Sequence, residues 1–176
     1  MTPIPPRCLD GFVAAPASDP DVELDTLSED ENRFFSIGCA CGNSHFAVHS
    51  YFNPHYYLEN ETAYGPIELR CTACQTERLC FSPFLHGYDV EIDHFPPDDN
   101  WRGESREFAC PACTSAAMSL VARFEYQESI IESMEAGDAG SSESRPRPRD
   151  MFSYFTLIGT CRSCGTKATI SSVECA

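Results

Sequence analysis

The sequence predicts a mostly β protein made of two tandem modules of antiparallel strands, with one short helix and an acidic N-terminal tail. Three observations predict this fold class. Apolar and polar residues alternate in short runs such as HFAVHSYF and MSLVARFEY, a pattern typical of strands with one buried face. Pairs of closely spaced cysteines lie between these runs. The order of runs and pairs then recurs about seventy residues later in the chain.

The first 32 residues are rich in Pro, Ala, Asp and Glu and show little helical or strand periodicity. Seven carboxylates fall between Asp19 and Glu31. A segment of this composition buries little apolar surface, so we predict an acidic Pro/Ala-rich tail over residues 1–32 that is flexible or only loosely docked. Phe34, Phe35 and Ile37 supply the first apolar run, and we expect order to begin near them.

Two similar modules follow, which we place at residues 33–97 and 104–176 with a linker at 98–103. In the first, FFSIGCACGNSHFAVHSYF and GPIELRCTACQTERLCF each set a cysteine pair between two β-rich runs. In the second, REFACPACTSAAMSLVARFEY and FTLIGTCRSCGTKATIS do the same. The similarity indicates either a duplication or two unrelated hairpins of like chemistry, and the sequence leaves both open.

The helix candidate is EYQESIIESMEA, because Ile130, Ile131 and Met134 recur at helical spacing before the break at Gly137. The sequence after it, GDAGSSESRPRPRD, is rich in Gly, Ser and Pro. That composition predicts a disordered loop at about residues 136–150. We interpret the basic run RPRPR within it as part of a solvated linker.

Eight of the eleven cysteines form four close pairs, and we predict that these eight are metal ligands: Cys39, Cys41, Cys71, Cys74, Cys110, Cys113, Cys161 and Cys164. Two pairs make one tetrahedral four-thiolate site, so the chain would hold two ions. The repeat favours pairing within each half, while a cross-braced arrangement stays open. Cys-Xaa-Cys is tighter than the usual spacing, so Cys39 or Cys41 is the least secure ligand and His45 a conceivable substitute. We interpret Cys80 and Cys175 as apolar strand positions.

The motifs C-A-C, C-T-A-C, C-P-A-C and C-R-S-C-G between β-rich segments resemble the zinc knuckles of the zinc-ribbon class. TCRSCGTKATI, with Gly165 after its second cysteine, is the most similar of the four. The resemblance implies two zinc-ribbon-like modules and two structural zinc ions as cofactors, each closing a small sheet. A further segment, FSPFLHGYDVE, is similar to one in uncharacterised bacterial cysteine-pair proteins and implies no activity.

Two other chemistries are open for these cysteines. Cys110 and Cys113 in CPAC have the spacing of a thiol–disulfide redox pair. Three further pairs in matching contexts, and a chain without a thioredoxin-like βαβ pattern around CPAC, favour zinc instead. Iron also accepts four thiolates in a tetrahedral site.

The formal net charge of −15 disfavours nucleic acid as a partner, because an acidic surface repels phosphate backbones. The sequence has no run of about 18 apolar residues that could span a membrane, and we find no secretory signal. We therefore expect a cytoplasmic location, with no nucleic acid and no membrane as partner. Metal ligation is the more common use of cysteine in such a reducing compartment.

All five histidines lie in the first half of the chain. Within LHGYDVEIDHF, the side chains of His86, Asp89, Asp93 and His94 would suit a metal-dependent hydrolase. The competing interpretation is a strand at DVEID with one face in water.

The sequence favours binding over catalysis. We predict a zinc-stabilised protein-binding module, an acidic adaptor, inhibitor or immunity-type protein that binds a basic protein surface. The hydrolase site is the first alternative, and redox exchange at Cys110 and Cys113 is the second.

Overall fold

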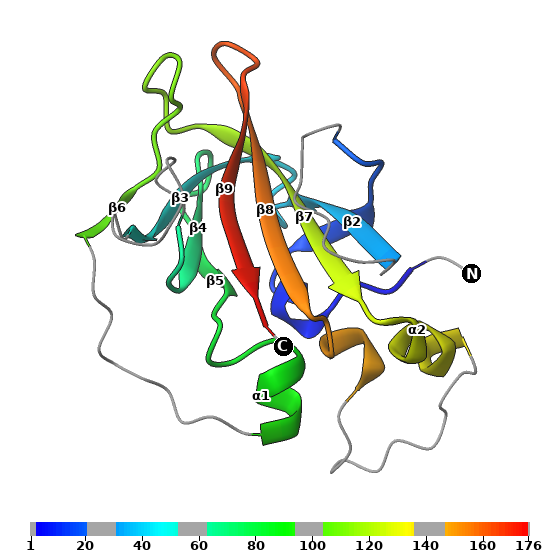
Figure 1. Cartoon of the computed structure of the whole chain (residues 1–176). Helices are drawn as coiled ribbons and strands as arrows, with labels where there is room; N and C mark the ends of the chain where they lie inside the picture. The colour runs from blue at the N-terminus through cyan, green and yellow to red at the C-terminus, as the bar shows by residue number, and fades with distance from the viewer. Residues whose placement is uncertain (1–2, 21–30, 53–62, 94–103, 136–146, 176) are drawn as a thin grey trace.

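The computed structural model describes residues 3–20, 31–52, 63–93, 104–135 and 147–175 (Figure 1). Its strands form one curled antiparallel sheet of nine strands. Among the described residues strand makes up 46% and helix 13%, so the predicted mostly β fold class is confirmed. The proposed division into modules stays a prediction, but the strands of both halves belong to this single sheet.

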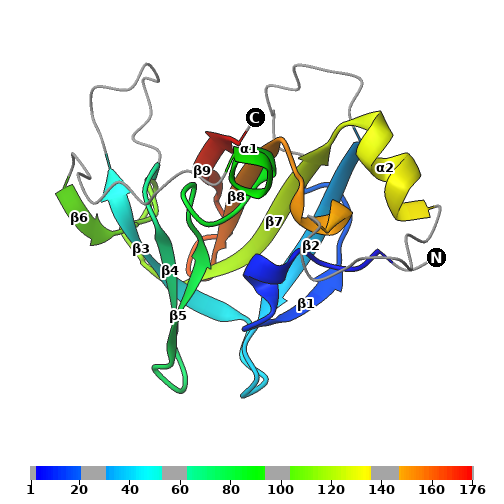
Figure 2. The ribbon, with the colours of Figure 1, turned by 90° about the horizontal axis from the view of Figure 1, so that it is seen from below.

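Each half of the chain contributes four of the strands, in the same order. The first half supplies β2 (Glu31–Gly38), β3 (His45–Phe52), β4 (Ile67–Cys71) and β5 (Glu77–Phe81). The second half supplies β6 (Glu104–Glu107), β7 (Met118–Tyr126), β8 (Tyr154–Cys161) and β9 (Lys167–Glu174). Figure 2 shows β7 in the middle of the curl, with β3, β4 and β5 to one side and β2 to the other.

The two sets of strands pair reciprocally. β2 follows one edge of β7 until Ile37 lies opposite Leu120. After the first cysteine loop, β3 continues along that edge with Phe46 opposite Met118, while β8 occupies the other edge. β6 in turn pairs with the far part of β3. Each half therefore offers a strand edge that the other half covers, which leaves fewer unpaired backbone groups.

Register repeats between the halves as well. Phe46 lies opposite Cys71 in the β3–β4 pair, and Met118 lies opposite Cys161 in the β7–β8 pair. Both outer hairpins contain an irregularity at the corresponding point, between Ile67 and Glu68 in the first half and between Leu157 and Ile158 in the second. The two halves thus share one strand plan down to single residues.

One hydrophobic core contains side chains of both halves. Phe81 of β5 stacks on Phe155 of β8 with ring centroids 4.1 Å apart, and Phe124 of β7 packs against Phe155 at 5.4 Å. All three side chains are fully buried. Because burying one aromatic side chain stabilises a fold by roughly 2–3 kcal/mol, this contact adds to the strand pairing in holding the halves together.

The N-terminal residues are part of the fold. η1 (Arg7–Leu9), a 3-10 helix, buries Cys8 and Leu9, and β1 (Val13–Pro16) pairs with β2. The prediction of a flexible or loosely docked tail is therefore wrong for residues 7–16. The backbone N–H of Arg7 donates to the carboxylate of the buried Asp150 at 2.7 Å, which fixes η1 against the second half. The most acidic part, residues 21–30, lies outside the described residues.

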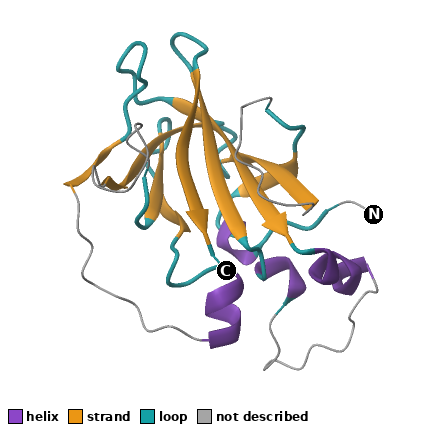
Figure 3. Ribbon diagram, viewed as in Figure 1, coloured by secondary structure: helices purple, strands orange, loops and turns teal. Residues whose placement is uncertain are grey.

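Helical segments gather at one end of the sheet, away from the loops at the top of Figure 3 that carry the second set of cysteines. α2 (Glu128–Glu135) confirms the predicted helix and buries Ile131. None of the described helices is long and apolar enough to cross a membrane.

Two other segments differ from the sequence prediction. α1 (Tyr88–Asp93) is a helix, so the interpretation of DVEID as a strand is wrong. The N–H groups of Tyr88 and Asp89 donate to the carbonyls of Phe152 and Cys175. Contacts with the end of the sheet therefore stabilise α1, and the spacing of apolar residues in its sequence does not predict it. The predicted loop at 136–150 is wrong for η2 (Pro148–Asp150), a 3-10 helix, and its residues 136–146 lie outside the described residues.

Candidate metal centres

Each cysteine pair lies in a loop that reverses the chain just after its second cysteine. The residue at that point has a positive φ in all four loops: Gly42 (89°), Gln75 (61°), Thr114 (61°) and Gly165 (75°). Its N–H donates to the carbonyl of the first cysteine of the pair, which closes the turn. A left-handed conformation is uncommon for a β-branched residue such as Thr114 and costs roughly 1–3 kcal/mol, so it marks a loop shaped for a purpose other than stability.

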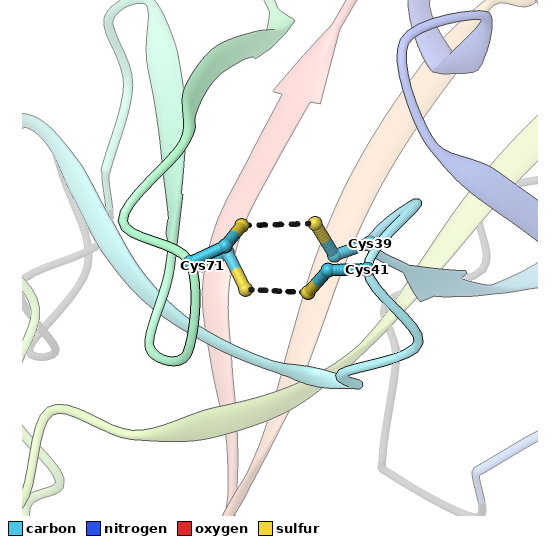
Figure 4. A group of neighbouring side chains, drawn as sticks. Cys39, Cys41 and Cys71 are labelled. Carbon is cyan, nitrogen blue, oxygen red and sulfur yellow. Dashed lines mark hydrogen bonds between the residues drawn. The ribbon is translucent and has the colours of Figure 1, made fainter.

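The first centre joins the loop between β2 and β3 to the loop between β4 and β5. The Sγ atoms of Cys39 and Cys74 are 3.6 Å apart, as are those of Cys41 and Cys71. Figure 4 shows the Cys39 and Cys41 side chains facing Cys71 across the gap between the loops. A tetrahedral ion with metal–sulfur bonds of about 2.3 Å holds its sulfurs about 3.8 Å apart, so the spacing fits.

The second centre has the same construction. Cys110 lies 3.6 Å from Cys164 and Cys113 lies 3.5 Å from Cys161, measured between Sγ atoms. In each centre the four sulfurs all lie within 4.8 Å of one another. The two cysteine groups could therefore hold two metal ions, each group coming from one half of the chain. The ring of His45 belongs to neither group.

Polar side chains around the sulfurs escaped the sequence analysis. The amide Nδ2 of Asn43 donates to the Sγ of Cys71 at 3.3 Å. The hydroxyl of Thr76 lies 3.3 Å from the Sγ of Cys74, and the hydroxyl of Thr166 lies 3.2 Å from the Sγ of Cys164. Groups of this kind orient metal ligands and stabilise their charge. The signal was present, since Asn43, Thr76 and Thr166 each stand two residues after the second cysteine of a pair.

The thiols of the first centre differ in acidity. The backbone N–H of Cys74 stabilises the thiolate of Cys71 and lowers the pKa of Cys71 to about 6. The N–H of Cys41 acts in the same direction on Cys39, but partial burial and the neighbouring sulfurs outweigh it and raise the pKa of Cys39 to about 11. Cys71 in this centre is therefore more readily deprotonated than Cys39.

The thiols of the second centre differ in acidity in the same way. The hydroxyl of Thr166 helps to lower the pKa of Cys164 to about 6. The N–H of Ser115 favours the thiolate of Cys113, yet the surrounding sulfurs outweigh it and raise the pKa of Cys113 to about 12. Four thiolates this close repel one another unless a cation lies between them, so both donor sets fit a divalent metal ion.

The CPAC pair is part of a four-sulfur group. Each close sulfur–sulfur contact in the second centre joins two different loops. Cys110, the first cysteine of the motif, is only 2% exposed. A disulfide exchanger needs an accessible thiolate at that position, so this burial favours metal ligation over redox exchange.

The described part of the alternative hydrolase site has a different character. Nδ1 of His86 accepts a hydrogen bond from the N–H of Ser82 at 3.0 Å, and burial lowers the pKa of His86 to about 4. His86, Cys8 and Asp150 line a cavity of about 230 Å³. Among the described residues neither His86 nor Asp89 belongs to a group of metal ligands. His94 and the side chain of Asp93 lie outside the described residues.

The three cysteines outside the centres are buried: Cys8, Cys80 and Cys175. Burial raises the pKa of Cys80 to about 12 and that of Cys8 well above its usual value. They therefore pack as small apolar side chains.

Comparison of the chain with protein-family models, with curated proteins and with solved structures finds no match in any of the three. The two cysteine groups are compatible with the zinc-ribbon-like class, and the distances between their sulfurs suit a metal ion.

Proposed function

We propose that the protein binds two structural zinc ions, one in each centre. The observation that carries this proposal is the pair of four-sulfur groups, each with all its sulfurs within 4.8 Å and each tying two loops together. Four cysteines fill the coordination sphere of zinc, so neither ion would have an open position for water. The ions therefore serve the fold, and the function lies on the surface.

We further propose that this surface binds a basic surface of another protein, as an acidic adaptor, inhibitor or immunity-type protein does. The chain carries a formal charge of −15 with 27 acidic and 12 basic side chains. Deprotonating eight thiols and adding two dipositive ions would take that charge to −19. A field of this sign accelerates encounters with basic partners and repels nucleic acid.

Elemental analysis of the full chain, purified under reducing conditions without added metal, tests the first proposal. We expect two zinc ions per chain. Two iron ions instead would mean that the centres hold iron and not zinc. A chain free of metal would overturn the proposal.

The partner proposal requires a different measurement. A protein captured on the immobilised chain at low salt is identified, and its dissociation constant is then measured at about 50 and 500 mM NaCl. We expect a basic partner whose affinity falls steeply with salt, since exposed charges are screened over about 10 Å at 0.1 M. An affinity that does not change with salt would contradict a role for the acidic surface.

A further inference from the structure

The first centre borders a cavity of about 360 Å³, a size in the range of small-molecule sites. Three of its four cysteines line this cavity, namely Cys39, Cys41 and Cys74. Phe12 and Phe46 form part of the wall, with their rings edge to face at 6.0 Å. The side chain of Phe12 comes from the N-terminal segment, which belongs to neither repeated set of strands.

The sulfurs of the two centres differ in exposure. In the second centre Cys110 and Cys161 are each 2% exposed, so two of its four ligands are closed off. In the first centre only Cys71 is buried, while Cys39 is half-buried and the other two cysteines are exposed. A ligand from solution can therefore reach three sulfurs of the first centre.

One cation lies in the wall of this cavity. The side chain of Arg78 makes no hydrogen bond or ion pair with any other described residue. The side chain of Arg78 packs against Gly11, since a Cβ atom added to Gly11 would be 3.2 Å from the Cδ of Arg78. No described residue that lines the cavity carries a carboxylate. The corresponding register position in the second half is Ala168, which carries no charge.

We infer that this cavity is the entry site for small anionic thiols, which exchange the metal ion of the first centre while the second centre keeps its own. The inference rests on the proposed zinc binding. The guanidinium of Arg78 attracts a carboxylate of the thiol, and the exposed Cys41 and Cys74 are the ligands it can displace.

The exchange needs no oxidant. The incoming thiol gives up its proton as its sulfur binds the metal, and the departing cysteine takes up one proton as its bond to the metal breaks. The number of metal–sulfur bonds and the charge stay the same. The chain would then pass one ion to an acceptor and remain folded around the other.

The test uses the full chain loaded with zinc, with pyridylazoresorcinol as a coloured zinc acceptor. Release is followed with no thiol, with reduced glutathione and with cysteamine, a cationic thiol. We expect one equivalent to leave roughly tenfold faster or more in glutathione than the other, the scale on which groups around a metal alter its binding. Cysteamine should accelerate this phase less.

Two matched pairs of variants locate the fast phase. Ala40→Phe narrows the cavity and Arg78→Ala removes its charge, and each should slow the glutathione-dependent phase severalfold. Ala112→Phe and Arg162→Ala make the same changes at exposed positions in the loops of the second centre and should leave that phase unchanged. Elemental analysis of each variant shows whether both ions are bound at the start.

The outcomes separate the two proposals. Two bound ions that leave together at one rate, or a fast phase that responds only to the changes at 112 and 162, would overturn the exchange site and leave structural zinc standing. Fewer than two ions at the start in the unmodified chain would overturn both.

Discussion

The two halves of the molecule share a strand plan and differ in what surrounds their candidate metal centres. In both, a cysteine lies at the end of a central strand opposite the start of its neighbour, as Cys71 lies opposite Phe46 and Cys161 opposite Met118. The first centre has a shorter loop, CAC in place of CPAC, and adjoins a cavity walled partly by the N-terminal segment. The strands therefore fix the four sulfurs of each centre in the same way, while the N-terminal segment adds a wall beside the first centre.

The halves also depend on each other. β2 and β3 follow β7, β6 follows β3, and Phe81 stacks on Phe155 across the core. A change in either half should therefore weaken the whole sheet.

Loss of one centre should destabilise both halves. Cys71→Ser and Cys161→Ser each remove a buried cysteine, so each chain should bind one metal ion fewer. Each chain should still unfold in one cooperative transition, but at a lower temperature, because metal binding contributes to folding free energy and the other centre and the shared core remain. Circular dichroism during heating, together with elemental analysis, measures this. A remaining transition of half the enthalpy would show that the halves fold independently.

Removing either ring of the stacked pair Phe81 and Phe155 should destabilise the chain nearly as much. Phe81→Ala and Phe155→Ala should each destabilise the chain by about 3–5 kcal/mol, as for other buried aromatic side chains. Denaturant unfolding followed by fluorescence and by circular dichroism gives the values. Leu79→Ala, at a side chain 38% exposed, is the control and should cost much less. Unequal losses for the two phenylalanines would mean that one half dominates stability.

A buried ion pair distinguishes the second half. Arg123 on β7 is 1% exposed and donates to Glu125 at 2.5 Å and to Asn32 of β2 at 2.7 Å. Arg123→Met should cost about 3–5 kcal/mol, because it leaves the carboxylate of Glu125 buried without that partner. The double change Arg123→Met, Glu125→Leu should recover part of the loss in denaturant unfolding. A double variant as unstable as the single one would argue for a role of the guanidinium beyond pairing.

The smallest effect concerns pH. Burial lowers the pKa of His86 to about 4 from an ordinary value near 6.5, so the folded chain binds this proton less readily than the unfolded chain. The resulting stability is present above about pH 6.5 and is lost as the pH falls toward 4, by about 1–3 kcal/mol. His86→Gln should flatten that part of the stability profile. His49→Gln, at a side chain 42% exposed, should leave it unchanged.

The sequence by itself determined the local features of this protein. Alternation over 45–52 and 118–126 gave two strands, because side chains on a strand point to opposite faces in turn. The four cysteine pairs specified four turns, because one or two residues between cysteines leave room only for a tight loop. The helix at 128–135 also followed from spacing along the chain. All these patterns are read within about ten residues.

Only the tertiary structure decided what pairs with what. No local signal indicates that β2 lies beside β7, or that Arg7 reaches Asp150, because such contacts depend on the fit of distant surfaces in one core. The docking of residues 7–16 escaped prediction because its few apolar side chains are ordered by the sheet they meet. The helix at 88–93 escaped it because its first N–H groups are satisfied by the carbonyls of Phe152 and Cys175. The cavity beside the first centre is likewise completed by a segment that lies far from its cysteines in sequence.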